Sequence, residues 1–345
     1  MNIYSVINYL RLILFPFSFI YGIFISIRNY LYYNEILFKY NSKSKIISVG
    51  NINTGGSGKT PLVIKLAEIL LDRNFKVAII SRGYRRKSKG MQVVFDTKNI
   101  VLKPEESGDE PYMISQFLME RYNNFYFIVS ENRIEAIRYL EKNFSSDYII
   151  LDDAFQQLVL KKDCDFVLID VNNFQRHKIL NRILLPAGNL REPLNSLYRG
   201  TAIFQNNKYS EIDTANFLKK FNKPIFKIRY TNSGIYDKEN KKIEGSINNV
   251  IAFCGIADPD SFKKSLENFK IKDFIAFPDH KNYTEKDLEY IKRNYSSGDS
   301  FITTEKDFVK IKNFDKFTET YPVYFIRLSI EIDKENELIN LILNL

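Results

Sequence analysis

A glycine-rich loop between an apolar run and a helical pattern constrains this chain more than any other feature. Residues 46–49 form the apolar run, residues 50–61 read GNINTGGSGKTP, and an apolar-rich stretch begins at residue 62. A strand, a glycine-rich turn and a helix make a phosphate cradle, because glycines let backbone N–H groups converge on phosphate oxygens at a helix N-terminus. The sequence therefore predicts a phosphate-binding loop at the carboxyl end of a buried strand.

The predicted loop assigns roles to the side chains in it. Lys59 is expected to reach the β- and γ-phosphates of a nucleotide, and Thr60 to ligate Mg²⁺. The usual pattern has glycine where this chain has Asn53, and asparagine tolerates the left-handed backbone region. The predicted nucleotide-binding residues are Asn53, Thr54, Gly55, Gly56, Ser57, Gly58, Lys59 and Thr60.

Strand-like and helical patterns alternate along the chain after residue 45. The apolar runs expected to be strands are 46–49, 77–81, 125–129, 148–151 and 166–170. Because these runs are apolar on both faces, they indicate a parallel sheet covered by helices. Such sheets bind ligands at the carboxyl ends of their strands. Four loops are expected to meet there: 50–60, 82–90, 130–133 and 152–157.

The pattern changes near residue 226 and restarts near residue 246. The stretch between them is typical of a hairpin or two-stranded connector, because short alternating runs flank a turn. The fold class is therefore α/β, with a P-loop-type parallel sheet, a two-stranded linker, a second smaller α/β domain and a hydrophobic N-terminal helix. The expected boundaries are 1–40 for the N-terminal segment, 41–225 for the phosphate-loop domain, 226–245 for the linker and 246–345 for the second domain.

The N-terminal segment is uncharged over residues 12–27, between Arg11 and Arg28. As a helix, a run of this length would span about 24 Å, short of the roughly 30 Å hydrocarbon core of a bilayer. Three interpretations stay open: a helix lying in the membrane interface, a short single span, and a helix buried against the protein. The excess of cations favours the first, with a face turned to anionic lipid on the cytoplasmic side.

Two acids end the apolar run at residues 148–151. Asp152 and Asp153 follow it directly, at a strand end that should lie beside the predicted loop. One carboxylate in such a place can hold Mg²⁺ through water, and the alternative is a solvated strand terminus. The candidates for a metal site are therefore Thr60, Asp152 and Asp153.

A set of motifs spread from residue 46 to residue 307 carries a resemblance to a known family. The motifs are GNINTGGSGKTP, SRGYRRK, GDEP, SENR, LDDAFQQ, LLPAGNLREPL, AFCGIADPDSF, FPDH and TTEKD. With them the chain resembles tetraacyldisaccharide 4′-kinase, the lipid A 4′-kinase family of Gram-negative bacteria. The fold that the resemblance implies is two α/β/α domains joined by a two-stranded linker.

The resemblance implies ATP- and Mg²⁺-dependent transfer of the γ-phosphate to the 4′-hydroxyl of a tetraacyl glucosamine disaccharide 1-phosphate. The product is the lipid A precursor of lipopolysaccharide. Because the acyl chains of the substrate stay in the membrane, the enzyme is expected at the cytoplasmic face of the bacterial inner membrane, against anionic lipid. No obligatory protein partner is expected. ATP rather than GTP is implied by the resemblance alone.

The resemblance also implies catalytic roles. Asp109 matches the family's catalytic aspartate and is expected to accept the proton of the sugar hydroxyl. His280 matches the family's catalytic histidine and can pair with Asp109; which of the two carries the proton is open. Arg133 and Arg191 match family arginines suited to phosphate oxygens, with an ion pair to a nearby acid as the alternative. With Lys59, these residues are the predicted catalytic set.

Other classes of protein share parts of the pattern. A membrane-associated partition-type ATPase, acting as a regulatory module, carries an additional lysine just before the paired glycines, where this chain has Thr54. A GTPase-like switch needs an N-K-x-D stretch at the end of a strand, and none is suitably placed. Nucleic acid is not expected as a partner, because the cations behind the net charge of +9 are spread along the chain.

Overall fold

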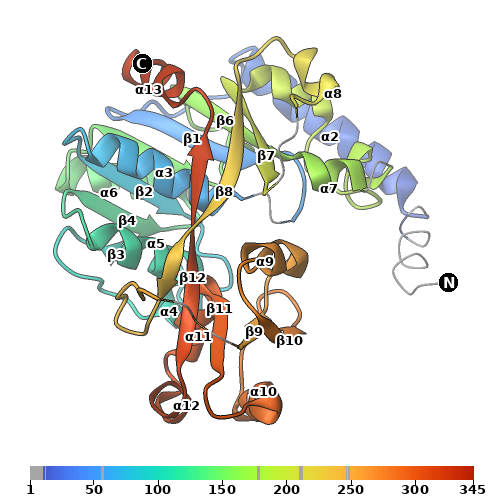
Figure 1. Cartoon of the computed structure of the whole chain (residues 1–345). Helices are drawn as coiled ribbons and strands as arrows, with labels where there is room; N and C mark the ends of the chain where they lie inside the picture. The colour runs from blue at the N-terminus through green and yellow to red at the C-terminus, as the bar shows by residue number, and fades with distance from the viewer. Residues whose placement is uncertain are drawn as a thin grey trace.

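The computed structural model describes residues 11, 13–55, 58–176, 179–209, 213–245, 247 and 249–345. These residues form one mixed sheet of twelve strands with helices packed against it (Figure 1). The strands are β1 Lys45–Asn51, β2 Val77–Ser81, β3 Gln92–Phe95, β4 Phe125–Val129, β5 Tyr148–Asp152, β6 Cys164–Asp170, β7 Ala202–Lys208, β8 Ile225–Tyr236, β9 Val250–Cys254, β10 Ile271–Ala276, β11 Ser300–Thr304 and β12 Val323–Ile332. The α-helices are α2 Phe15–Tyr33, α3 Lys59–Leu71, α4 Pro104–Ser107, α5 Asp109–Met119, α6 Arg133–Asn143, α7 Val171–Arg176, α8 Asn216–Lys219, α9 Pro259–Ser265, α10 Glu285–Ile291, α11 Glu305–Ile311, α12 Asp315–Thr320 and α13 Glu335–Leu343.

The strand order in the sheet is β10-β9-β11-β12-β8-β7-β6-β1-β5-β2-β4-β3. Strand β1 pairs in parallel with β5 and β6, and β2 pairs in parallel with β4 and β5. Ile46 packs into the core on one face of the sheet and Ile47 into the core on the other. Because such strands are buried on both faces, their apolar runs are continuous, and the mostly parallel α/β sheet predicted from those runs is confirmed.

Two long antiparallel strands connect the two halves of the sheet. Strand β8 pairs in parallel with β7 and then antiparallel with β12, which continues into the half formed with β11, β9 and β10. The second strand of the connection is therefore β12 rather than the charged stretch 237–245. That stretch turns back only at a single bridge between Tyr236 and Lys242.

The last helix, α13, returns to the half of the sheet that carries the phosphate loop (Figure 1). Its Leu338 and Ile342 belong to the same core as Leu62 of α3. Its Glu335 lies 2.9 Å from Lys65 of α3. Although the sequence division counts α13 with residues 246–345, the helix packs with the first half of the molecule.

Helix α2 lies against the segment 184–196 by its polar face. The hydroxyl of Tyr21 donates to the backbone carbonyl of Arg191 at 2.8 Å. The guanidinium of Arg28 lies 2.8 Å from a carboxylate oxygen of the fully buried Glu192. Within the described part of the chain, no helix combines the length and the apolar character needed to cross a membrane.

Candidate active site

The loop after β1 enters its helix at Gly58. This residue has a φ of 87°, in the left-handed region, and Lys59 begins α3. A Cβ at Gly58 would collide with the hydroxyl of Tyr230 on β8 and the side-chain amide of Asn206 on β7, so glycine lets the loop pass close to these two strands. Gly55 is also left-handed, with a φ of 102°. Two of the predicted nucleotide-binding residues lie outside the described part of the chain: Gly56 and Ser57.

The first residues of the loop are held by the segment 189–191. Asn53 is buried and forms an antiparallel bridge with Leu190, so its backbone is extended rather than left-handed. The backbone N–H of Thr54 donates to the carbonyl of Asn189 at 2.8 Å. The LREP motif that carried part of the resemblance thus supports the start of the phosphate loop.

Lys59, Asp153 and Arg191 form a cluster at the mouth of the loop. Lys59 Nζ lies 3.3 Å from Asp153 Oδ1. Arg191 Nη1 donates to both oxygens of Asp153, at 3.1 and 3.0 Å. Burial opposes ionisation of Asp153, but the charges of Lys59 and then Arg191 outweigh it and lower the pKa of this carboxyl. Arg191 therefore makes the ion pair that the sequence left open as an alternative to phosphate binding.

Asp152 ends β5 with one carboxylate oxygen bonded and the other without a partner among the described residues. The hydroxyl of Ser81 donates to Oδ2 at 3.0 Å, whereas Oδ1 is buried and accepts no hydrogen bond from the part of the chain that the structure describes. Burial raises the pKa of Asp152 to about 6, against the lowering effect of the Lys59 charge. This buried carboxylate oxygen lies beside the Ser81 hydroxyl and the Asp153 carboxylate. Such a group of oxygen atoms fits a hard cation such as Mg²⁺.

Arg133 is buried beneath the same strand end. Its guanidinium donates to the carbonyl of Ser130 and, at 3.2 Å, to the carbonyl of Asp152. Arg133 begins α6, and the side chain of Asn132 caps that helix by accepting from two backbone N–H groups. The polar contacts of the Arg133 guanidinium are therefore with backbone carbonyls behind the metal-site candidates.

Glu110, in the first turn of α5, faces the phosphate loop. The hydroxyl of Thr60 donates to Glu110 Oε2 at 3.4 Å, and Lys306 Nζ lies 2.8 Å from Oε1. Burial opposes ionisation, but the charge of Lys306, followed by those of Lys59 and His280, outweighs it and lowers the pKa of Glu110. This carboxylate therefore stands among cations that come from both halves of the sheet.

Asp109 lies one residue before Glu110 and makes a different contact. Its Oδ2 is 3.2 Å from Lys310 Nζ of α11. Both side chains are partly shielded from solvent, the lysine to 9% and the aspartate to 28% exposure. Asp109 therefore reaches the interface between α5 and α11, next to the carboxylate that faces the loop.

His280 follows β10 with a left-handed backbone, at a φ of 58°. Its ring packs against Tyr84 with centroids 5.2 Å apart, and Nε2 lies 3.8 Å from Asp279. Burial and then the nearby charge of Lys306 lower the pKa of His280, although Asp279 and Glu110 oppose this. The acids that act most strongly on His280 are thus Asp279 and Glu110, and a pair with Asp109 stays a prediction.

Known proteins share both the sequence and this arrangement. A sequence model of the family described as LpxK, tetraacyldisaccharide-1-P 4′-kinase, matches residues 10–345. The tetraacyldisaccharide 4′-kinase of Aquifex aeolicus is 34% identical, over 96% of this chain and 98% of its own. The chain belongs to the tetraacyldisaccharide-1-P 4′-kinase family. Another relative with the same description, from Pelodictyon phaeoclathratiforme, is 33% identical over 96% of each chain.

The fold of this family is also the fold of the chain. A crystal structure of LpxK from Aquifex aeolicus in complex with ATP has a TM-score of 0.78 to it, with 32% identity over 97% of this chain and 99% of that one. The chain is accordingly a kinase of lipid A biosynthesis whose acceptor is tetraacyldisaccharide 1-phosphate. The resemblance to the tetraacyldisaccharide 4′-kinases seen in the motifs is confirmed.

Most of the predicted site residues of this kinase come together at the carboxyl edge of the sheet. Lys59, Asp152, Asp153 and Arg191 are joined by direct contacts or by the effect of one charge on another. The sequence assigned no role to Glu110. The GDEP motif is its signal, because successive residues at a helix start point about 100° apart and only one of two adjacent acids can face the loop.

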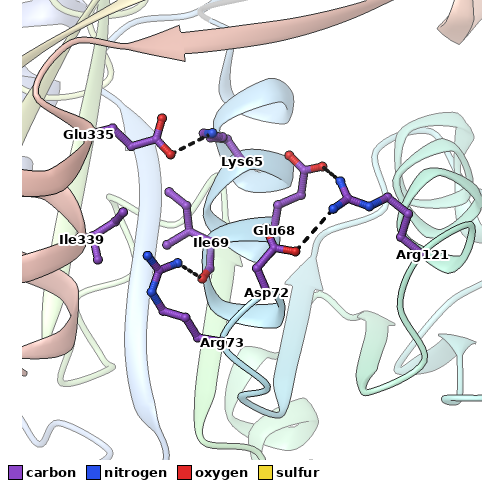
Figure 2. A pocket seen from close by; sticks show the side chains of 8 residues that line it. All are labelled: Lys65, Glu68, Ile69, Asp72, Arg73, Arg121, Glu335 and Ile339. Carbon is purple, nitrogen blue, oxygen red and sulfur yellow. Dashed lines mark hydrogen bonds and ion pairs between the residues drawn. The ribbon is translucent and has the colours of Figure 1, made fainter.

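A groove of about 540 Å³ lies behind α3, away from the predicted site (Figure 2). Most of its charges are already paired: Arg121 lies 3.5 Å from Glu68 and 3.4 Å from Asp72. Arg73 donates to the backbone carbonyl of Ile69 at 2.7 Å. The ion pair between Lys65 and Glu335 closes one side of it. Since each of these cations already has a partner within the protein, the groove lies where α3 meets α13 and the segment after α5, and it is a poor candidate for a charged ligand.

Proposed function

We propose that this kinase binds ATP on residues 53–60 and transfers its γ-phosphate to a sugar hydroxyl placed over Asp109. One observation carries the proposal: four side chains lie together at the carboxyl edge of the sheet, namely those of Lys59, Thr60, Asp152 and Glu110. The ATP in the related crystal structure supports the choice of nucleotide. The sheet would then divide into a P-loop-type domain and a second smaller domain, linked by β8 and β12.

The site also suits Mg²⁺. Asp152 Oδ1 is buried without a hydrogen-bond partner in the described ranges, and Thr60 offers a hydroxyl oxygen at the start of α3. Among the described side chains, no cluster of three or more histidines, cysteines and acids could hold a metal ion unaided. That suits Mg²⁺, which is usually bound by one or two carboxylates together with water and substrate phosphates. When bound, the ion would neutralise charge on the transferring phosphate, with Thr60, Asp152 and Asp153 as its protein ligands.

Two cations would hold the phosphates, and a third would support the residues beside them. Lys59 and Arg191 both contact Asp153, yet an ammonium has three donors and a guanidinium five, so each keeps donors for phosphate oxygens. Arg133 braces the backbone of Asp152 from behind. Positioning and charge neutralisation of this kind account for most of the catalysis in phosphoryl transfer.

The proton of the attacking hydroxyl would pass to Asp109. This carboxylate lies 3.2 Å from Lys310 Nζ and stands beside Glu110 at the start of α5. His280 would assist from the other half of the sheet, where its lowered pKa favours the neutral imidazole. A base must lie within reach of the hydroxyl in the substrate complex, so the acceptor sugar would lie between α5 and the loop at residue 280.

Helix α2 would carry the enzyme on the cytoplasmic face of the inner membrane. While its polar face contacts Arg191 and Glu192, its opposite face leaves large apolar side chains exposed. These exposed residues are Phe15, Phe17, Phe19, Ile20, Ile23, Phe24 and Ile27. Such a face is typical of a helix lying in a lipid interface, and it would bring the acylated substrate beside the segment that supports the phosphate loop.

A direct assay tests this function. Purified protein in detergent, given labelled ATP, Mg²⁺ and a tetraacylated disaccharide 1-phosphate, should produce labelled lipid, and GTP in a parallel reaction should serve poorly. A partition-type ATPase would instead hydrolyse ATP without phosphorylating the lipid. Absence of labelled lipid from a folded, ATP-binding preparation would contradict the proposal.

A further inference from the structure

Lys306 reaches the predicted nucleotide site from the second half of the sheet. It lies in the first turn of α11, and its Nζ is 2.8 Å from Glu110 Oε1. The other oxygen of Glu110 accepts a hydrogen bond from the Thr60 hydroxyl at 3.4 Å. One oxygen of Glu110 therefore contacts the half of the molecule that carries the phosphate loop, and the other contacts Lys306 in the second half.

The backbone around Lys306 is fixed by its neighbours. The Thr304 side chain caps α11 by accepting from the Asp307 N–H at 3.1 Å and donates to Asp307 Oδ2 at 2.8 Å. The same Oδ2 accepts from the backbone N–H of Gly255, also at 2.8 Å. These bonds tie the start of α11 to the end of β9, so Lys306 projects from a rigid point.

Further ion pairs hold α11 and β12 against α5. Arg327, which is buried, donates to both oxygens of Glu120 at 2.9 and 3.1 Å and to Glu305 at 2.9 Å. Burial lowers the pKa of Lys306, but the charge of Glu110 outweighs it and raises this pKa, so the ammonium is maintained. Lys306 therefore approaches Glu110 from a helix that is held to the end of β9 by hydrogen bonds and to the end of α5 by ion pairs.

We propose that Lys306 is a positioning residue for phosphoryl transfer, which holds Glu110 beside Thr60 when α11 and α5 are in contact. The inference rests on the proposed function of the loop and of Thr60. In this role, Lys306 places a positive charge from the second half of the sheet beside the nucleotide site. The nucleotide site is then complete only when the two halves of the sheet are in contact.

The test compares variants of this lysine with a matched lysine of the same interface. Lys306→Met removes the charge, Lys306→Arg keeps it, and Lys312→Met is the control. Lys312 also bridges the halves, at 3.3 Å from both Tyr112 Oη and Gln116 Oε1. The lipid-kinase assay gives kcat and the KM for ATP, and thermal unfolding shows whether each variant is folded.

The expected result is a loss of about 10²-fold in kcat for Lys306→Met, the size that a small misplacement of a positioned group can cause. The KM for ATP should change less than about fivefold, Lys306→Arg should recover at least tenfold of the loss, and Lys312→Met should stay within about threefold of the wild type. If Lys306→Met does not fold, Lys306→Gln carries the same expectations.

A double-mutant cycle shows whether Lys306 acts through Glu110. Glu110→Gln alone should resemble Lys306→Met, and the double variant should be no slower than the slower single variant, because residues of one network are not additive. Multiplying effects, or a Lys306→Met variant with wild-type kcat, would overturn the inference. An inactive wild-type enzyme would instead refute the proposed function, so the two failures are distinct.

Discussion

Lys310 Nζ lies 3.2 Å from Asp109 Oδ2, so the carboxylate predicted to accept the sugar proton is paired across the two halves of the sheet. Asp109→Asn keeps the size of this side chain but removes the proton acceptor. We expect kcat to fall by about 10²–10⁴-fold, the usual contribution of general base catalysis. The Kd for ATP should change little in a nucleotide titration, because Asp109 lies outside the phosphate loop.

Lys310→Met shows whether the effect of Asp109→Asn comes from the lost proton acceptor or from the lost ion pair between Asp109 and Lys310. It breaks the same contact and leaves the carboxylate in place, so we expect a loss in kcat of less than about tenfold, since partly exposed pairs are worth about 1 kcal/mol or less. Equal losses for Asp109→Asn and Lys310→Met would show that Asp109 has a structural rather than a chemical role.

Gly58→Ala should disable the phosphate loop. The new Cβ would overlap the Tyr230 hydroxyl and the Asn206 side chain, at a backbone φ of 87°. Strain at such a position costs about 1–3 kcal/mol, and the loop must move to relieve it. We expect the Kd for ATP, measured by calorimetry, to rise by at least about tenfold.

Gly55→Ala is the matched control for strain without collision. Gly55 is left-handed as well, with a φ of 102°, but a Cβ there meets no atom of the described residues within 4 Å. Adding Tyr230→Phe to Gly58→Ala removes one colliding atom and should recover part of the affinity. If Gly55→Ala weakens ATP binding as much as Gly58→Ala does, packing against β8 is not the reason that position 58 needs glycine.

The gathering of Lys59, Asp152 and Asp153 could be predicted because it follows from the parallel sheet. Continuous apolar runs place strands side by side in one direction, and their carboxyl ends then share an edge. The same reasoning could not find the partner of β8. Residues 226–245 and 323–332 both show alternating patterns, and a single strand's pattern does not say which distant strand it will join.

The choice between Asp109 and Glu110 was also beyond the sequence. Both acids begin α5, and the rotation of that helix, set by its packing on α3 and α11, decides which one faces Thr60. Lys306 belongs to the TTEKD motif, but its contact depends on how the two halves of the sheet meet. Contacts between elements far apart in the chain are decided by packing, which local patterns do not contain.

Glu192→Gln should weaken the packing of α2 against the segment 184–196. The carboxylate is fully buried, with Arg28 at 2.8 Å and Arg199 at 3.0 Å. Removing the charge leaves two guanidinium groups with a neutral partner, and breaking a buried pair of this kind costs about 3–5 kcal/mol. We expect the free energy of unfolding, measured with denaturant, to fall by about 2–4 kcal/mol.

Glu331→Gln is the control for Glu192→Gln. Glu331 lies 2.7 Å from Arg229, but both side chains are exposed, and such pairs contribute less than about 1 kcal/mol. A loss of stability for Glu192→Gln no larger than that for Glu331→Gln would mean that α2 does not depend on the buried carboxylate.

Asp152 should make the stability of the metal-free protein depend on pH. Its pKa in the folded state, about 6, lies above the unfolded value of roughly 3.9. A raised pKa contributes stability that is fully present below the unfolded value and is lost as pH rises through the folded value. Relative to Asp152→Asn, the wild type should therefore lose about 1 kcal/mol between pH 5 and pH 7, measured by denaturant titration with a chelator.

Mg²⁺ should reverse this effect at pH 7. A cation bound to the ionised carboxylate stabilises the folded state by mass action, so the wild type should gain stability with added Mg²⁺ and Asp152→Asn should gain less. A wild-type profile parallel to that of Asp152→Asn from pH 5 to pH 7 would show that Asp152 is not the group that titrates.

The exposed face of α2 should bind lipid through its aromatic side chains. Phe19 and Phe24 are 67% and 68% exposed, so replacing both with serine should leave the free energy of unfolding nearly unchanged. Each buried phenylalanine is worth about 1.5–3 kcal/mol, and the double variant should bind anionic vesicles at least about 10²-fold more weakly in a flotation assay. Tyr290→Ser is the control, because Tyr290 is an exposed aromatic residue on α10, in the other half of the sheet. Unchanged flotation of the Phe19 and Phe24 variant, or equal binding to neutral and anionic vesicles, would remove α2 as the contact with an anionic membrane.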